Sequence, residues 1–304
     1  MNALILVLSL FLVPDQKTVK SPVIVPDFNP VAQEVEPSVV EAPVEDPELK
    51  NLEWNRYVTK NFTILSIDNE RGKLLAENIE FLKTSSLVRW GFPDVTFTKE
   101  CRIFCVPSYS LLKKFFNINA VRVQNRKDLN VIWFVLDDKP TKSLLPLITQ
   151  VSLGEYEIAH KTILPFWFKR GAYILNGAPA DIRQELTSFN EIARKEQFTH
   201  TAEQMLVSTE EEYNKQSAEN KKIYDEQAIC LCLLLRKEFG EVKLQGFLRI
   251  LSRNKPDVAL AVVYFFKDLA SFDKSYVRYM KDLCSDIVRN ETPDSYLTIT
   301  PVQK

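Results

Sequence analysis

Glycine, histidine and cysteine are scarce in this sequence, and their scarcity excludes several kinds of site. Seven glycines among 304 residues form neither a phosphate-binding loop nor a dinucleotide-binding fingerprint, and no serine lies in a Gly-x-Ser-x-Gly elbow. The only histidines are His160 and His200, and neither has ligand spacing to a cysteine pair. A Cys/His zinc cluster is therefore not expected, and we predict no cofactor.

An excess of positive charge is also lacking. The 39 Lys and Arg residues are balanced by 40 Asp and Glu residues, which gives a net charge of −1. No run of Lys or Arg is long enough to form a basic stripe. Nucleic acid is therefore not expected as a partner.

The five cysteines are too few, and odd in number, for a disulfide framework in a chain of this size. Cys101 and Cys105 would share one face of a strand, where they could pack or pair with a partner. Cys230 and Cys232 would point in different directions from a helix. We interpret all five cysteines as small apolar core residues.

Residues 3–13 are an uninterrupted apolar run, with the length of a signal-peptide core and less than the ~20 residues of a spanning helix. We therefore interpret residues 1–13 as a signal or anchor segment and expect an exported chain, which is periplasmic, secreted or membrane-attached. Met1 and Asn2 supply no side-chain positive charge, and no small-x-small cleavage pattern precedes Pro14. A buried or docked N-terminal element is the alternative.

Residues 14–50 hold seven of the sixteen prolines, no glycine and repeated Val, Glu and Pro. Such a composition cannot bury a core. It is typical of an extended, disordered acidic linker, stiffened toward polyproline II. We expect this segment to tether the folded part of the chain.

The sequence is globular from residue 51 onward, and its pattern changes near residue 144. Residues 51–143 have the β-branched and aromatic runs of strands, whereas residues 144–304 have helical spacing. The predicted fold class is α+β, with a small mixed sheet and its helices followed by a mostly helical half. The expected strands are 61–66, 101–106, 121–124 and 130–138, and the expected helices are 72–86, 111–116, 144–160, 165–175, 210–239, 242–253, 257–269 and 271–288.

Three segments in order resemble the gluzincin superfamily of zinc peptidases, and in particular its small bacterial peptidase MA-like members. The first is WNRYVTKNFTILS with CRIFCVPSYSLLKKFF, the second is GEYEIAHK with LPFWFKRGAYIL, and the third is YDEQAICLCLLLRKEFGEVKLQGFLRIL. The resemblance covers residues 54–287. It implies the gluzincin-like arrangement of a mixed sheet, a site helix and supporting helices.

The resemblance also implies that the zinc site is lost. An active member has two histidines one helical turn apart, a glutamate beside the first, and a glutamate ligand on the next helix. The corresponding positions here are Tyr156, Glu157, His160 and Arg170. A single histidine cannot hold zinc, and the arginine adds a fixed positive charge, so no metal is expected.

Glu157 keeps the position of the general base, but it would have no metal-bound water to activate. A guanidinium can bind a carboxylate through two hydrogen bonds. We therefore expect Arg170 to reach back to Glu157, so that this ion pair fills the vacated cavity.

These inferences predict a catalytically inactive pseudopeptidase that serves as a binding or structural module on its acidic linker. Its partner would be a protein or peptide docked against the sheet edge, and residues 3–13, if retained, would attach it to a membrane. Zinc peptidase activity is not expected. One alternative is a metal-free hydrolase or other enzyme that uses Glu157 with Tyr156 or His160. Another is an α+β assembly protein unrelated to peptidases.

Two further features have simple interpretations. His200 has no acidic or cysteine partner nearby in the sequence, which favours a surface or capping role. Asp137 and Asp138 follow a strand, where such a pair more often starts a turn than binds a cation.

Overall fold

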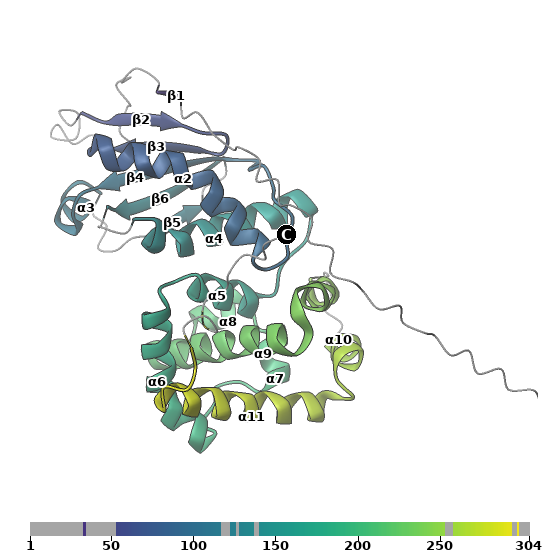
Figure 1. The fold of residues 1–304 in the computed structure, drawn as a ribbon. Coiled ribbons are helices and arrows are strands. Elements are labelled where there is room, and N and C mark those ends of the chain that lie inside the picture. The colour runs from purple at the N-terminus through teal and green to yellow at the C-terminus, as the bar shows by residue number, and fades with distance from the viewer. Residues whose placement is uncertain are drawn as a thin grey trace, which may run out of the picture. The chain divides into compact units, whose positions relative to one another are not determined.

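The computed structural model describes residues 33–34, 53–116, 122–125, 128–136, 140–252, 258–293 and 297. All of them belong to one unit of the chain, residues 30–303. The fold is α+β as predicted, with a mixed sheet followed by helices (Figure 1). Residues 1–13, all of the linker except Gln33 and Glu34, and the pair Asp137–Asp138 lie outside the described residues. None of the helices described is both long and apolar enough to span a bilayer.

The sheet has a parallel centre and antiparallel edges. In the order β1-β2-β3-β4-β6-β5, the pairs β3–β4 and β4–β6 are parallel and the outer pairs are antiparallel. Ile64, Ile103 and Ile132 stand side by side on the three central strands. The strands are β1 (Gln33–Glu34), β2 (Asn55–Val58), β3 (Phe62–Ser66), β4 (Glu100–Val106), β5 (Arg122–Asn125) and β6 (Leu129–Val135).

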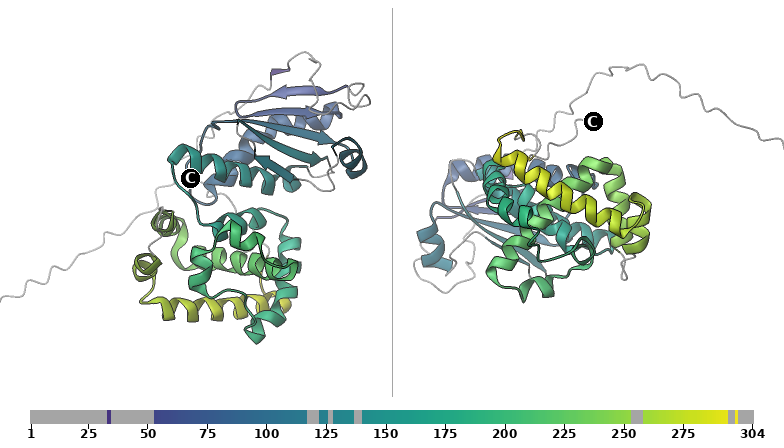
Figure 2. Two further views of the ribbon diagram at one scale, coloured as in Figure 1. Left: turned by 180° about the vertical axis from the view of Figure 1, so that it is seen from behind. Right: turned by 90° about the horizontal axis from the view of Figure 1, so that it is seen from below.

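Helices cover both faces of this sheet. Helices α2 (Asn69–Val88) and α4 (Pro140–His160) pack against each other over one face, and α3 (Tyr109–Phe116) contacts β4 and β6 on the other (Figures 1 and 2). Successive side chains of β4 point to opposite faces of the sheet, which gives two apolar layers. Cys101 and Ile103 lie in the layer under α2 and α4, and Phe104 lies in the layer on the other face.

The helical half is built around one long helix, α9 (Ala218–Leu251), which contacts α5, α6, α8, α10 and α11. Buried apolar side chains of α9 and of the helices around it form a single cluster. This cluster includes Trp167, Tyr224, Phe247 and Phe272. The remaining helices are α5 (Phe166–Leu175), α6 (Pro179–Lys195), α7 (Ala202–Val207), α8 (Glu210–Asn214), α10 (Val258–Phe265) and α11 (Leu269–Val288).

The predicted helices differ from the observed ones in three respects. Ser217 caps the start of α9 and separates it from α8, so the expected helix from residue 210 is two helices. Helices α6 and α7 were not predicted. The break expected before residue 242 is a kink at Gly240, whose φ of 67° is readily adopted by glycine.

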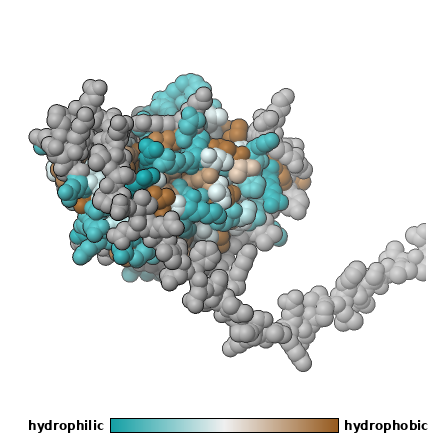
Figure 3. Space-filling model, turned by 90° about the horizontal axis from the view of Figure 1, so that it is seen from above, coloured by the Kyte–Doolittle hydropathy of each residue, from teal (hydrophilic) through white to brown (hydrophobic). Residues whose placement is uncertain are grey.

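One face of the molecule is mainly polar. On the face that Figure 3 shows, hydrophilic residues make up most of the coloured area, and hydrophobic residues lie between them. Two large apolar side chains near the turn from α4 to α5 are exposed, Ile158 by 44% and Ile163 by 64%. Exposed apolar side chains that lie close together often mark a binding surface.

Candidate functional site: the C-terminal end of helix α4

Helix α4 carries the predicted site residues from the sheet into the helical half. Its residues Leu144, Leu147, Ile148 and Val151 recur at helical spacing and pack on the sheet. The same helix then passes beyond the sheet layer, and Tyr156 joins the core of the helical half. The last turn of α4 therefore lies where the two apolar cores of the chain adjoin.

Tyr156 and His160 lie together, as their spacing predicts. Their ring centroids are 4.3 Å apart, and the Tyr156 ring also packs against Phe92 at 4.5 Å. Tyr156 is only 8% exposed, whereas His160 is exposed. Tyr156 is thus an aromatic packing residue of this core.

Glu157 closes the turn between α4 and α5. Its Oε1 accepts hydrogen bonds from the Leu164 backbone N–H at 2.6 Å and from Lys169 Nζ at 3.0 Å, and Lys169 also reaches Oε2 at 3.3 Å. The predicted ion pair between Glu157 and Arg170 is therefore wrong. Successive residues of a helix point about 100° apart, so Lys169 faces α4 while Arg170 faces a different neighbour.

Arg170 pairs with Asp225 on α9. Its Nε donates to Asp225 Oδ1 at 2.9 Å, and its Nη2 donates to Oδ2. The Tyr213 hydroxyl also donates to Asp225, at 3.1 Å. The guanidinium carbon lies 5.6 Å from the Tyr173 ring centroid and 5.1 Å from that of Tyr213. Burial acts to lower the pKa of Arg170, but the hydrogen bonds and charge of Asp225 outweigh burial and raise it.

Gly171 brings α5 unusually close to α9. A Cβ at this position would lie 2.5 Å from Cys232 Sγ and 2.7 Å from the Ala228 carbonyl oxygen. No side chain fits there without moving a helix. The close approach sets α5, which carries Arg170, directly against α9, which carries Asp225.

A cavity of about 310 Å³ runs beside this part of α4. Four of its lining residues on α4 share one helix face: Val151, Gly154, Glu155 and Ile158. Gly154 has no atom within 4 Å of the place where a Cβ would stand, so the groove is open there. The other lining residues are Lys99, Asn130, Glu157, Thr162 and Ile163.

Glu155 is a buried residue that lines this groove, and it was not predicted as a site residue. The residue is 1% exposed. Its Oε2 accepts hydrogen bonds from the backbone N–H and hydroxyl of Thr98, at 2.6 and 2.7 Å, and its Oε1 accepts one from Asn130 Nδ2 at 2.8 Å. These neutral donors tie α4 to the segment before β4 and to the start of β6.

Other charged groups do not gather into a metal site. Among the residues that the structure describes, no group of three or more His, Cys, Asp or Glu side chains is placed to hold an ion. His200 is half-buried: its Nδ1 shares a hydrogen bond with Thr199 Oγ1 at 2.8 Å, and its ring meets Tyr224 edge-on. Burial lowers the pKa of His200, which is consistent with a packing role.

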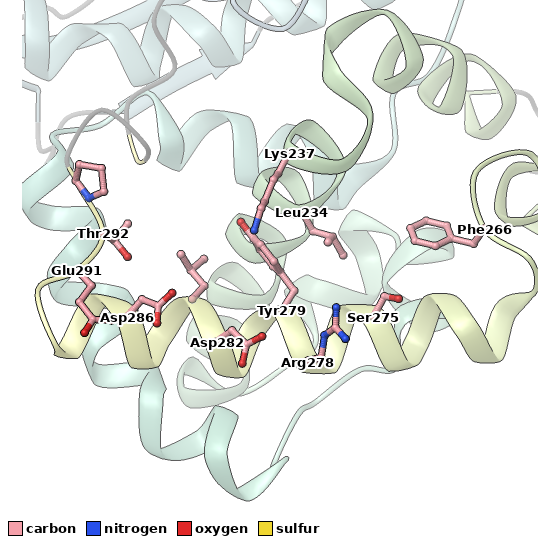
Figure 4. A pocket seen from close by; sticks show the side chains of 12 residues that line it. Leu234, Lys237, Phe266, Ser275, Arg278, Tyr279, Asp282, Asp286, Glu291 and Thr292 are labelled. Carbon is pink, nitrogen blue, oxygen red and sulfur yellow. The ribbon is translucent and has the colours of Figure 1, made fainter.

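A second cavity, of about 320 Å³, lies between α9 and α11 (Figure 4). The buried residues Leu234, Tyr279 and Leu283 line it from the two helices. Lys237 Nζ lies 5.4 Å from the centroid of the Tyr279 ring. The remaining lining residues are Phe266, Ser275, Arg278, Asp282, Asp286, Glu291, Thr292 and Pro293.

Comparison with models of known protein families and with curated protein sequences finds no match for this chain. The groove along α4 and the contacts of the four predicted site residues are therefore what bears on function. The structure brings Tyr156 next to His160, and it directs Glu157 and Arg170 to different partners.

Proposed function

We propose that this chain is a catalytically inactive, peptidase-like module that binds an extended segment of a protein or peptide in the groove along α4. The acidic linker, residues 14–50, tethers the module. The proposal is supported by the order of the elements, in which a mixed sheet is followed by a helix with paired aromatic side chains and then by supporting helices. This is the order that the resemblance to gluzincins implies.

The observation that carries the proposal is that the groups at the peptidase-like positions are committed to structural contacts. Both carboxylate oxygens of Glu157 accept a hydrogen bond from Lys169, and Oε1 also accepts one from the Leu164 backbone N–H. A carboxylate held in this way is poorly placed to take a proton from water. Arg170 is occupied by Asp225 in a two-hydrogen-bond pair.

The same contacts argue against a metal-free enzyme at these residues. Burial raises the pKa of Tyr156, with a smaller opposing effect from the charge of Arg249, so its hydroxyl stays protonated at neutral pH. His160 lies against the Tyr156 ring, and Glu157 is paired with Lys169. A base, an acid and an open position for a substrate are not assembled at this point of the groove.

The groove has the features of a peptide-binding surface. Ile158 and Ile163 offer apolar contact, and the charged residues Lys99 and Glu157 also line the groove. Asn130, at one wall, is paired in the sheet with Asn125 of β5, the last strand in the sheet order. An extended segment could therefore contact the groove with its side chains and add to the sheet through its backbone.

The test is selection of peptides from a phage-displayed random dodecapeptide library on the full chain, followed by affinity measurement. Ile158→Glu with Ile163→Glu places charge on the apolar rim, and we expect it to weaken binding at least tenfold. Val263→Glu is the matched control, because Val263 is also 64% exposed but lies on α10. Absence of any enriched peptide, or equal loss of affinity in the control, would overturn the proposal.

Metal content separates this module from a zinc peptidase. The full chain is purified without chelator, incubated with one equivalent of zinc, desalted and analysed by mass spectrometry. We expect substoichiometric zinc. One equivalent of zinc retained by the wild type and lost in His160→Ala would contradict the inactive assignment.

A further inference from the structure

The side of β2 that faces away from β3 is covered by a short piece of the linker. Strand β1 consists of Gln33 and Glu34, and it pairs antiparallel with β2, with Gln33 opposite Val58 and Glu34 opposite Tyr57. Figure 1 shows β1 beside β2 at one edge of the sheet. These two residues are the part of linker 14–50 that the structure describes. The linker thus contributes a strand to the fold.

The spacing of the prolines explains why this part of the linker can pair with the sheet. Pro30 and Pro37 enclose six residues, VAQEVE, that contain no proline, and β1 lies inside this window. Proline has no backbone N–H and interrupts a hydrogen-bonded ladder, so a strand needs such a window. Glutamate and glutamine have low strand propensity. We therefore expect the pairing of β1 with β2 to be weak and reversible.

Strand β2 is held in place from its other side. All four of its residues pair with β3, and the Tyr57 hydroxyl donates to the Asn69 backbone oxygen at 2.8 Å. Gly72 of α2 lies close to the Tyr57 ring, because a Cβ at Gly72 would be 2.9 Å from Tyr57 Cε2. Strand β2 therefore does not depend on β1 for its position. Loss of β1 would leave an ordered edge strand with unpaired backbone groups, which is a template for another strand.

We propose that the outer side of β2 is a strand-docking site that the linker of the same chain occupies, and that an extended peptide binds there when the linker strand is displaced. Backbone hydrogen bonds supply the affinity in this kind of recognition. The partner is a proline-free peptide segment rich in β-branched residues, because these residues suit a strand better than Gln33 and Glu34 do. The linker strand is then an intramolecular competitor of that partner.

The connection between β1 and β2 determines the strength of this competition. Residues 35–52 join β1 to the described residues that begin at 53. A short connection gives a tethered segment an effective concentration on the order of 1 mM. A free peptide with the linker sequence must therefore exceed about 1 mM to displace the linker strand from the wild type. The same peptide meets no competitor in a chain whose linker cannot pair.

This docking site is separate from the groove along α4. In the strand order, β2 lies next to β1 at one end, whereas β5 is at the other end. The variant Ile158→Glu with Ile163→Glu should therefore leave the pairing of β1 with β2 unchanged. Failure of the groove proposal and failure of this one can be told apart, because each is measured with its own variants.

Hydrogen exchange of the full chain, followed by mass spectrometry, tests the pairing in the wild type. Pairs in an antiparallel ladder alternate, so one of the two β1 amides faces β2. We expect this amide to exchange about tenfold more slowly than the same amide in the free peptide PVAQEVEP, which spans residues 30–37. Equal exchange in the chain and in the peptide would overturn the proposal, and this result requires no variant.

Gln33→Pro with Glu34→Pro removes both N–H groups of β1. We expect the outward amides of Asn55–Val58 to exchange about tenfold faster in this variant. Val39→Pro with Val40→Pro is the matched control, because it places two prolines elsewhere in the linker and should leave β2 protected. Equal exchange in the two variants would contradict the role of β1. Unchanged exchange in Leu129–Val135 of β6 shows that each variant is folded.

Addition of peptide then tests the docking site itself. Tenfold protection at an effective concentration of about 1 mM corresponds to a Kd of about 0.1 mM for PVAQEVEP on the variant that lacks β1. At this concentration the peptide should restore protection of β2 in the variant and have little effect on the wild type. The peptide PVAVTVEP, with β-branched residues in place of the glutamine and glutamate, should bind about threefold more tightly. A peptide that restores no protection, or equal affinities of the two peptides, would refute the site or its preference.

Discussion

The sheet half and the helical half hold two of their carboxylates, Glu155 and the partly buried Asp225, in different ways. Glu155, beside the sheet, is surrounded by neutral donors from Thr98 and Asn130. Asp225, in the helical half, is bound by the guanidinium of Arg170 and by a tyrosine hydroxyl. A carboxylate that accepts hydrogen bonds from neutral donors joins the segments that carry those donors. A carboxylate in an ion pair also balances the charge of a cationic side chain. Substitutions should therefore have different effects in the two halves.

The largest effect is expected from Asp225→Ala. This change leaves the Arg170 guanidinium half-buried between two tyrosine rings without its counter-charge, which should lower the free energy of unfolding by about 2–3 kcal/mol. Urea unfolding measures the effect. Asp286→Ala is the control. The Asp286 side chain is 43% exposed and that of its partner Arg289 is 59% exposed, so this pair should contribute less than about 1 kcal/mol. Equal effects in the two variants would show that burial does not distinguish these pairs.

Glu226 is expected to have an intermediate effect that depends on pH. Burial is the main cause that raises its pKa to about 7, and its Oε2 has no hydrogen-bond partner among the residues that the structure describes. Because the folded state holds this proton more tightly than the unfolded state, stability should fall as pH rises from about 4.5 to 7 and then level off.

Glu226→Gln should remove this decrease. Relative to the variant, the wild type should lose about 2 kcal/mol between pH 5 and pH 8, as measured by urea unfolding at each pH. Glu219→Gln, at an exposed position in the first turn of α9, is the control and should run parallel to the wild type. If the stability of Glu226→Gln depends on pH in the same way as that of the wild type, ionisation of Glu226 does not destabilise the folded state.

The smallest effect is expected from Glu155→Gln. The amide oxygen can still accept the hydrogen bonds from Thr98, but the NH₂ cannot accept the one that Asn130 Nδ2 donates to Oε1, so the loss should be about 1 kcal/mol. Added salt should not change this loss, because the donors are neutral. Glu157→Gln sharpens the comparison, since its pair with partly exposed Lys169 should weaken in 1 M NaCl. Two losses with the same salt dependence would contradict the distinction.

The sequence was sufficient to predict most of the sheet and the main helices. Strands β3, β4 and β6 are rich in β-branched and aromatic residues, and α4 has a clear apolar face. Helix α6 was missed because its sequence is mostly polar, although Ile182, Leu186, Phe189 and Ala193 recur at helical spacing and are buried. Strand β2 is four residues long, and its pairing with β3 determines it more than its own pattern does.

At the site, spacing within one helix was informative and pairing between helices was not. The four-residue interval predicted that Tyr156 and His160 would lie together. It could not show which face of α5 meets α4, and this decides whether Lys169 or Arg170 reaches Glu157. Asp225 lies 55 residues from Arg170 in the sequence, and only the packing of α5 on α9 joins them.

The close approach at Gly171 limits how the region around the site can be redesigned. Attempts to install metal ligands on these two helices would vary positions 156, 160 and 170. Position 171 cannot vary with them, because a methyl group alone would collide with Cys232 and with the backbone of Ala228. A library that keeps this one glycine fixed would retain folded members, whereas one that randomises it would sample mostly chains whose α5 cannot dock.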